Sequence, residues 1–275
     1  MNPIDDFFNS IVTLPTLPKV VQEVMQMLDR DEVSLNALAR TVEHDAVIAA
    51  KVLKMANSSY YGATRAIKTI EDAIAILGLS KLRTLVIASG VTNAVAPMSG
   101  LDLQRFWRHS LVTAAISREV ATALGRDAEV AYIAGLLHRI GSLLIQMVFP
   151  RISAEVESAS GNLGVEARQR LEHDTIGLDH CQIGEELANR WNFPREISLI
   201  LRDYAKPLDK SACELAPVVY VSAHIASGLE RTENAAHIAN NLNADVMTML
   251  NMDKAEWADR IEAYRGLVKE AEAFI

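Results

Sequence analysis

Residues 134–141 read Ala-Gly-Leu-Leu-His-Arg-Ile-Gly and place His138 and Arg139 side by side. Asp127 can cap the apolar run before them, so we expect a helix that opens there and ends near His138. Upstream, Asp102 can cap a long helix that reaches Leu124 and terminates at a glycine. We therefore expect residues 134–141 to contain the end of a helix that is preceded by another long helix.

The composition of the whole chain favours packed helices. Half of the 275 residues are apolar, only 13 are glycine and 8 are proline, and aromatic residues make up 5%. No stretch of several residues alternates between apolar and polar with a period of two, so no strand is predicted. The predicted fold class is all-α. The helices expected later in the chain cover about 165–172, 181–191, 194–204, 215–228 and a final amphipathic helix from 253 through 268.

The clearest break in the chain is Ala-Pro-Met-Ser-Gly at residues 96–100. Proline stops a helix, while serine and glycine leave the backbone free to turn. We predict an N-terminal helical lobe over residues 10–96 and a second helical lobe over residues 101–275. The end of the second lobe, residues 241–275, is interpreted as a C-terminal helical extension.

Charge and hydropathy indicate a cytoplasmic protein. The formal net charge is −8 and no cluster of lysine and arginine stands out, which disfavours direct binding of DNA or RNA. The first six residues are acidic and lack the pattern of a signal peptide. The longest apolar run, around residues 218–226, is shorter than the roughly 18–20 residues that span a bilayer, so no membrane association is expected. The two cysteines, Cys181 and Cys213, are interpreted as reduced thiols.

Several strings of sequence, in their order and spacing, resemble the HDOD family. They lie at residues 14–18, 45, 51–58 and 70–78 in the first lobe, and at residues 106–110, 134–141 and 180–194 in the second. Each string alone is weak, but the combination is specific. The resemblance covers residues 10–230, which would form the whole HDOD unit.

The resemblance implies two all-helical lobes, of which the second is a helical bundle like that of HD-domain phosphohydrolases and phosphodiesterases. It also implies a regulatory or scaffolding role in bacterial signal transduction, with signalling proteins as partners. HDOD units often adjoin domains that make or degrade cyclic dinucleotides. The length of this chain leaves no room for such a domain beside the HDOD unit, so we expect a stand-alone module.

Catalytic HD domains hold divalent cations with a histidine, a consecutive His-Asp pair and a later aspartate. By resemblance, His109 and His138 fall at the two histidine positions, Arg139 and Ala223 replace the two aspartates, and His180 falls where some relatives place a further ligand. Two unit charges about 4 Å apart interact by about 4 kcal/mol at an effective dielectric of about 20. A carboxylate at this distance attracts a metal ion, whereas an arginine in its place repels the ion. We therefore expect a vestigial metal site, no catalytic residue and no cofactor. One divalent ion such as zinc on the three histidines is the open alternative.

Three functions remain open. The leading one is a non-catalytic signalling module that binds a protein or a small ligand. The second is a residual metal-dependent phosphohydrolase that uses the remaining histidines and a carboxylate, with Asp174 or Asp179 as the first candidates. The third is a sensor in which Arg139 holds a small anionic ligand or a nucleotide, since a guanidinium matches a phosphate in geometry.

Two features of the first lobe have plainer interpretations. His44 and Asp45 form a literal His-Asp pair, but Asp45 is better interpreted as a helix cap. Asn57 ends its helix and is favoured as a structural cap over a ligand contact. Together with Tyr60 and Tyr61 it marks a candidate surface for a ligand or partner, or for the seam between lobes.

Overall fold

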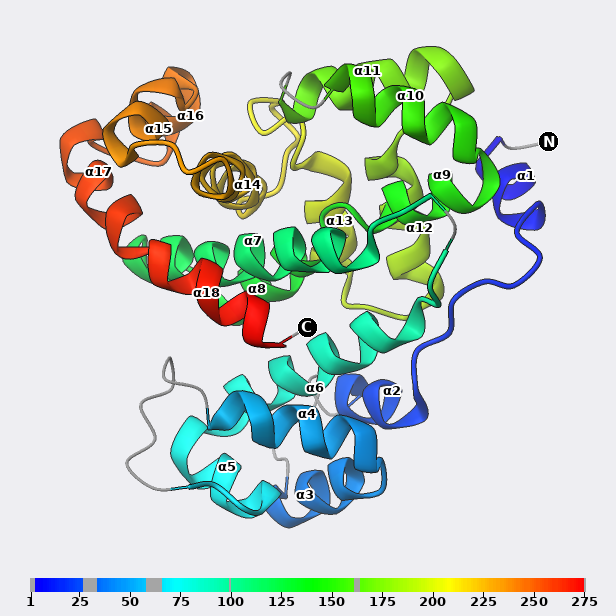
Figure 1. Cartoon of the computed structure of the whole chain (residues 1–275), viewed down its shortest axis with the longest axis vertical. Coiled ribbons are helices and arrows are strands. Elements are labelled where there is room, and N and C mark those ends of the chain that lie inside the picture. The colour runs from blue at the N-terminus through cyan, green and yellow to red at the C-terminus, as the bar shows by residue number, and fades with distance from the viewer. Residues whose placement is uncertain (1–2, 27–33, 58–65, 99, 161–163, 275) are drawn as a thin grey trace. The chain divides into compact units, whose positions relative to one another are not determined.

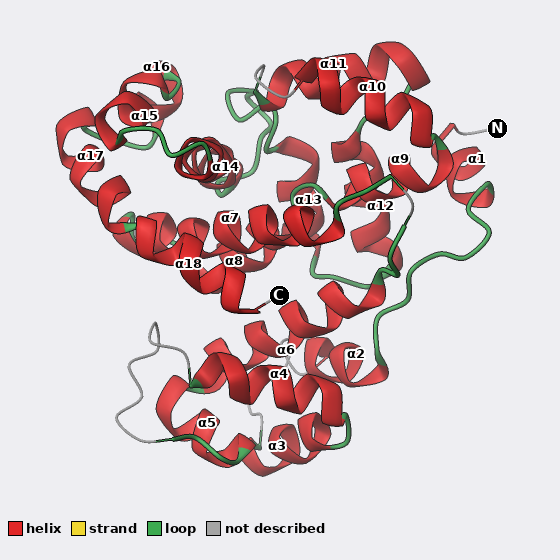
Figure 2. Cartoon of the chain, in the orientation of Figure 1, coloured by secondary structure: helices red, strands yellow, loops and turns green. Residues whose placement is uncertain are grey.

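The protein is all-α. The computed structural model describes residues 3–26, 34–57, 66–98, 100–160 and 164–274, and within these residues every regular element is a helix (Figure 2). This confirms the predicted fold class. The chain divides into two compact units, a larger one of Met1–Leu14 and Pro97–Val268 and a smaller one of Pro15–Ala96 and Lys269–Ile275.

The smaller unit packs short helices whose starts follow the capping signals in the sequence. Its helices are α2 (Lys19–Gln26), α3 (Leu35–Glu43), α4 (Ala46–Ala56), α5 (Ile70–Leu77) and α6 (Leu79–Ala94) (Figure 1). Ser34 caps α3 and Thr69 caps α5, each by accepting a backbone N–H with its hydroxyl. Gly90 on α6 lies against Val21 on α2 so closely that a Cβ there would overlap the valine side chain. A glycine is thus required where these two helices meet.

The larger unit contains the remaining helices. They are α1 (Pro3–Asn9), α7 (Leu103–Ala123), α8 (Ala128–Leu137), α9 (Ile140–Val148), α10 (Pro150–Ser160), α11 (Val165–Ile176), α12 (His180–Arg190), α13 (Arg195–Asp203), α14 (Ala216–Glu230), α15 (Ala235–Asn241), α16 (Ala244–Met249), α17 (Lys254–Ala263) and the start of α18 (Arg265–Phe274). The caps Asp102 and Asp127 open α7 and α8 as predicted, and α7 packs against both α8 and α14.

Several helices differ from those predicted from the sequence, either in their boundaries or because they were not predicted. The final amphipathic helix is not continuous: it breaks at Tyr264, where the backbone N–H bonds to both Arg260 and Ile261 and the turn tightens. Helices α9 and α10 were not predicted. Helix α9 starts directly after Arg139 without a side-chain cap, whereas α10 starts at Pro150, a start signal that the sequence interpretation missed. The helix predicted over 165–172 continues to Ile176 and ends at Gly177, which has a left-handed φ of 74°.

The stretch Ala128–Val148, which contains α8 and α9, is long and apolar enough to cross a membrane when judged by length and composition alone. However, 83% of its most apolar window is buried inside the structure. A core helix of a folded domain has the same properties, so this stretch is weak evidence for a membrane span.

Candidate functional site

The three histidines singled out by the sequence lie in the larger unit and are buried. His109 is on α7, His138 lies between α8 and α9, and His180 is the first residue of α12, with 8%, 2% and 0% of their surfaces exposed. The ring centroids of His109 and His138 are 5.5 Å apart. The ring of Tyr204 lies 5.4 Å from that of His138 and 5.7 Å from that of His180. A tyrosine that the sequence did not indicate therefore takes part in this cluster.

His180 uses both of its ring nitrogens within the protein. Its Nδ1 is 2.5 Å from Oε2 of Glu172, and its Nε2 is 2.5 Å from the hydroxyl of Tyr204. The backbone N–H of His180 also donates to Oε2 of Glu172, at 2.8 Å. Burial raises the pKa of Glu172, but the charge and hydrogen bonds of His180, together with Arg168, bring it below its usual value. A buried, ionised carboxylate thus holds the imidazole in place.

The start of α12 is fixed by a capping box and by a close helix contact. The carboxylate of Asp179 accepts the N–H groups of Cys181 and Gln182, and the Gln182 side chain accepts the N–H of Asp179. On α9, Gly141 touches the same turn: a Cβ there would overlap the carbonyl oxygen of His180. The backbones of α9 and α12 therefore meet directly beside the histidine.

His109 is paired with a carboxylate at the end of α14. Its Nδ1 lies 2.8 Å from Oε2 of Glu230, and Nε of Arg108 lies 3.6 Å from the other oxygen. Burial raises the pKa of Glu230, but the hydrogen bond and charge of His109 and the charge of Arg108 lower it overall. One ring nitrogen of His109 is therefore engaged by an ionised carboxylate.

His138 differs from the other two histidines. Its Nδ1 is 2.7 Å from the carbonyl oxygen of Gly135, which can only accept, so Nδ1 carries the hydrogen. Its Nε2 is buried and has no hydrogen-bond partner among the residues that the structure describes. Burial, and then the charges of His109 and Arg139, lower the pKa of His138 well below 6.5. His138 is therefore a neutral imidazole with an unused acceptor.

Arg139 is directed to a carboxylate on α10. Its Nη2 lies 3.2 Å from Oε2 of Glu157, and the Nη2 of Arg168 on α11 contacts the same oxygen. The guanidinium carbon of Arg139 lies 5.9 Å from the centre of the Phe106 ring. Arg168 also reaches the cluster around His180, since its Nη1 is 3.5 Å from Oε1 of Glu172. Arg168 thus connects the exposed carboxylate of Glu157 to Glu172, the partner of the buried His180.

These side chains do not fit the metal centre of catalytic HD domains. Within the described residues, no group of three or more histidine, cysteine, aspartate or glutamate side chains is arranged to hold a metal ion. His180 has no free ring nitrogen, Arg139 contributes positive charge, and Ala223 on α14 is buried and has no donor atom. No step of a reaction can therefore be assigned to a metal bound by these residues.

The carboxylates suspected from the sequence do not reach the histidines. Asp179 serves as a helix cap, and Asp174 is exposed on α11. Within the described residues neither carboxylate joins the histidines in a group that could hold a metal ion. The carboxylates in contact with the histidine rings are Glu172, on the mostly polar helix α11, and Glu230, the last residue of the mostly buried α14, and no motif in the sequence marks either of them.

The candidate residues of the smaller unit that the structure describes have structural roles. The amide of Asn57 bonds the backbone of Leu53 and both backbone groups of Ile67, all at 2.8 Å, so it ties the end of α4 to Ile67. Tyr60 and Tyr61 lie outside the described residues. The carboxylate of Asp45 accepts the N–H groups of Val47 and Ile48, as predicted for a helix cap.

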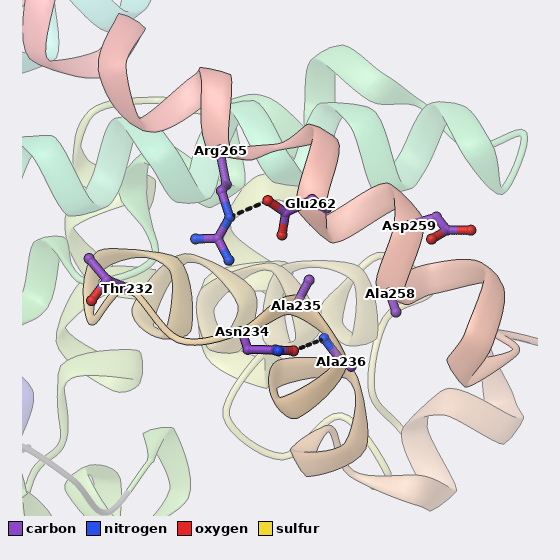
Figure 3. Close-up of a pocket in the computed structure, with 8 residues that line it drawn as sticks. All are labelled: Thr232, Asn234, Ala235, Ala236, Ala258, Asp259, Glu262 and Arg265. Atoms are coloured by element: carbon purple, nitrogen blue, oxygen red, sulfur yellow. Dashed lines mark hydrogen bonds and ion pairs between the residues drawn. The ribbon is translucent and has the colours of Figure 1, made fainter.

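A separate hollow in the larger unit lies between α15 and α17 (Figure 3). Its lining residues are Thr232, Asn234, Ala235, Ala236, Ala258, Asp259, Glu262 and Arg265. Most of its charged and amide groups are already used: Arg265 bonds Glu262 and the carbonyl of Glu233, each at 2.7 Å, and Asn234 caps α15, which leaves the exposed carboxylate of Asp259. The histidine cluster is therefore the better candidate site.

Comparison with known proteins places this site in a family. The HDOD domain model matches residues 14–207. A protein from Shewanella amazonensis SB2B, described as a candidate phosphohydrolase, is 28% identical, with a TM-score of 0.80 over 98% of this chain and 97% of that one. A candidate signal transduction protein from Marinobacter aquaeolei VT8 shares the fold, at 22% identity and a TM-score of 0.74 over 100% of this chain and 60% of that one.

A relative from Treponema pallidum (strain Nichols) is 25% identical over 193 residues, which is 69% of this chain. This chain therefore spans only 37% of the length of that relative. The domain match covers well over half of the chain and includes the buried histidines, so the protein belongs to the HDOD domain family.

Proposed function

We propose that the protein is a non-catalytic regulatory module of bacterial signal transduction, which works by binding a partner protein or a small ligand. The observation that carries this proposal is that protein side chains already bond several of the histidine nitrogens at the positions where HD relatives hold metal. Glu172 and Tyr204 occupy both ring nitrogens of His180, and Glu230 occupies Nδ1 of His109.

The charges in the cluster support the same conclusion. Hydrolysis in HD enzymes depends on metal ions that lower the pKa of a bound water, and carboxylates must balance the charge of those ions. Here Arg139 lies beside His138 and lowers its pKa further, so the local field opposes a cation. A site of this kind can recognise a ligand without activating water.

The alternative, a residual metal-dependent phosphohydrolase, is favoured by one observation. Nε2 of His138 is buried and unpaired, so it could still act as a ligand. The similarity to the Shewanella amazonensis protein agrees with this reading. Even together with Nε2 of His109, whose Nδ1 alone is bonded to Glu230, this makes two nitrogens, fewer than the three protein ligands that catalytic metal sites use, so the binding function is preferred.

An assay of turnover separates the two functions. Protein purified without a histidine tag is incubated with manganese and with bis(p-nitrophenyl) phosphate, cyclic dinucleotides or nucleotides. We expect no hydrolysis above that of the His138→Ala variant. Metal-dependent turnover that disappears in His138→Ala would establish the phosphohydrolase instead.

The kind of partner is also part of the proposal. A net charge of −8 repels phosphate backbones, so we propose signalling proteins or a small ligand as partners rather than nucleic acid or a membrane. The proposed location is the cytoplasm. Affinity purification from the native cell tests this, and recovery of ribonucleoprotein or membrane fractions alone would contradict it.

A further inference from the structure

Two arginines of the larger unit converge on a single carboxylate oxygen. Nη2 of Arg139, at the start of α9, and Nη2 of Arg168, on α11, both contact Oε2 of Glu157, on α10. The three residues come from three different helices. Their meeting point is therefore set by the packing of α9, α10 and α11 and is not a local pairing along one helix.

The cations and the anion of this cluster differ in exposure. The side chains of Arg139 and Arg168 are 21% and 11% exposed, whereas the side chain of Glu157 is 53% exposed. The arginines are thus fixed and largely covered, while the carboxylate reaches them from the surface. Burial raises the pKa of Glu157, but Arg168, Arg139 and Arg105 lower it overall, so this oxygen lies in a positive environment.

The arginines have other support, so they would keep their places if Glu157 moved away. Arg168 also contacts Glu172, and Arg139 lies near the face of Phe106. In addition, Nε of Arg139 is buried and has no hydrogen-bond partner among the described residues. A buried donor without a partner is costly, and an oxygen of an anionic ligand can accept its hydrogen bond.

A phosphoryl group fits this geometry better than the carboxylate does. Glu157 presents the same oxygen to both guanidiniums, whereas a phosphoryl group presents three oxygens and can bond each guanidinium fork separately. The limited exposure of both arginines restricts the ligand to a small molecule. We propose that Arg139 and Arg168 form a binding site for a small phosphorylated ligand, in which Glu157 is a built-in competitor for the same position.

This inference rests on the proposed binding function and names the ligand class of that site. It also carries a regulatory consequence. The apparent affinity for a ligand is the intrinsic affinity multiplied by the fraction of molecules whose site is free, so a site that Glu157 occupies more often binds the ligand more weakly. Glu157 would therefore set the ligand concentration at which the module responds.

The test is calorimetric titration of the full chain with inorganic phosphate and, separately, with adenosine monophosphate, in a metal-chelating buffer. Glu157→Gln removes the competing charge, and we expect it to bind phosphate at least tenfold more tightly than the unsubstituted protein. Glu155→Gln is the matched control, because Glu155 is exposed on the same helix and loses the same charge. It should leave the affinity unchanged.

Substitution of the arginines tests the other half of the site. In the Glu157→Gln background, Arg168→Gln and Arg139→Gln should each weaken phosphate binding at least tenfold. Arg139→Lys keeps the charge but loses the fork, and a loss of about threefold or more is expected. This conservative variant keeps the inference testable where Arg168→Gln fails to fold.

The outcomes are distinct. Tighter binding of adenosine monophosphate than of phosphate identifies an organic phosphate as the ligand, and the reverse identifies free phosphate. Equal affinities of the Glu157→Gln, Glu155→Gln and unsubstituted proteins would overturn the inference, as would binding that survives both arginine substitutions. The proposed function fails on a different result, metal-dependent turnover, which this titration does not measure.

Discussion

His138 and His180 are two buried histidines that pack against the same tyrosine ring, yet their surroundings differ. Every polar atom of the His180 ring is bonded, by Glu172 on one side and Tyr204 on the other. His138 is bonded on one side only, and its Nε2 has no partner. A fully satisfied buried group contributes to stability, whereas an unsatisfied one costs stability and is retained for another reason. We therefore interpret His180 as structural and His138 as part of the binding site.

The largest expected effect is the loss of His180. His180→Leu removes the imidazole from the buried carboxylate of Glu172, which keeps only the backbone N–H of residue 180 and Nη1 of Arg168, and it leaves the Tyr204 hydroxyl without its partner. Removing one member of a buried pair costs about 3 to 5 kcal/mol, and we expect the free energy of unfolding to fall by that amount. Chemical denaturation measures it.

The double variant His180→Leu with Glu172→Leu is the control for this prediction. It removes the carboxylate together with its imidazole partner, so it should be more stable than His180→Leu alone. A double variant whose loss equals the sum of the two single losses would show that the pair is not coupled.

The second prediction concerns the contact that places His180. In Gly141→Ala, the new methyl group meets the His180 carbonyl and lies 2.9 Å from the Gly184 nitrogen, both of which are backbone atoms. Helices α9 and α12 must then separate, at a cost of about 1 to 3 kcal/mol. Thermal or chemical unfolding checks the loss.

The matched control for this variant is Gly184→Ala on the facing helix. A Cβ at Gly184 would lie 3.6 Å from the Ile140 side chain, which is an ordinary contact. We expect the free energy of unfolding to change by less than about 1 kcal/mol in this variant. An equal loss in both variants would mean that the close approach of the backbones is not what matters.

The contrast between the two histidines was only partly visible in the sequence. The all-α class followed from composition and from caps such as Asp102 and Asp127, because these act locally. The three histidine positions followed from the resemblance to the HDOD family. Neither source of information could show which ring nitrogens are bonded.

The partners of the histidines come from elsewhere in the chain. Glu230 lies 121 residues from His109, and Tyr204 lies 24 residues from His180. Such pairings depend on how the helices pack, and no periodic pattern within a single helix encodes them. For the same reason the sequence favours Asp179, directly before His180, and Asp174, which follows a histidine, over Glu172, which makes the contact.

A smaller effect is expected from pH, and it isolates His138. Because its pKa in the folded protein is well below 6.5, the unfolded chain takes up a proton near pH 6.5 that the folded chain does not. Stability should therefore fall as the pH decreases below 6.5, by on the order of 1 kcal/mol per unit. Glu172 and Glu230 have pKa values below 4.5, so their contributions persist above that pH and are lost only below it.

Measurement of unfolding between pH 5 and pH 8 tests this assignment. The slope between pH 5 and pH 6.5 should become smaller in His138→Leu, which has no titrating ring. A slope that is the same in both proteins would assign the proton uptake to other groups.

The smallest expected effect is that of His138→Leu at pH 8, where the histidine is neutral in both the folded and the unfolded chain. The substitution removes one hydrogen bond to Gly135, worth about 1 kcal/mol, but it also removes the unpaired Nε2 from the core. The two changes oppose each other, so the free energy of unfolding should change by less than about 1 kcal/mol. A loss as large as that of His180→Leu would mean that His138 is as firmly integrated as its neighbour. The unpaired nitrogen would then be no sign of a binding site, and the distinction between the two histidines would not hold.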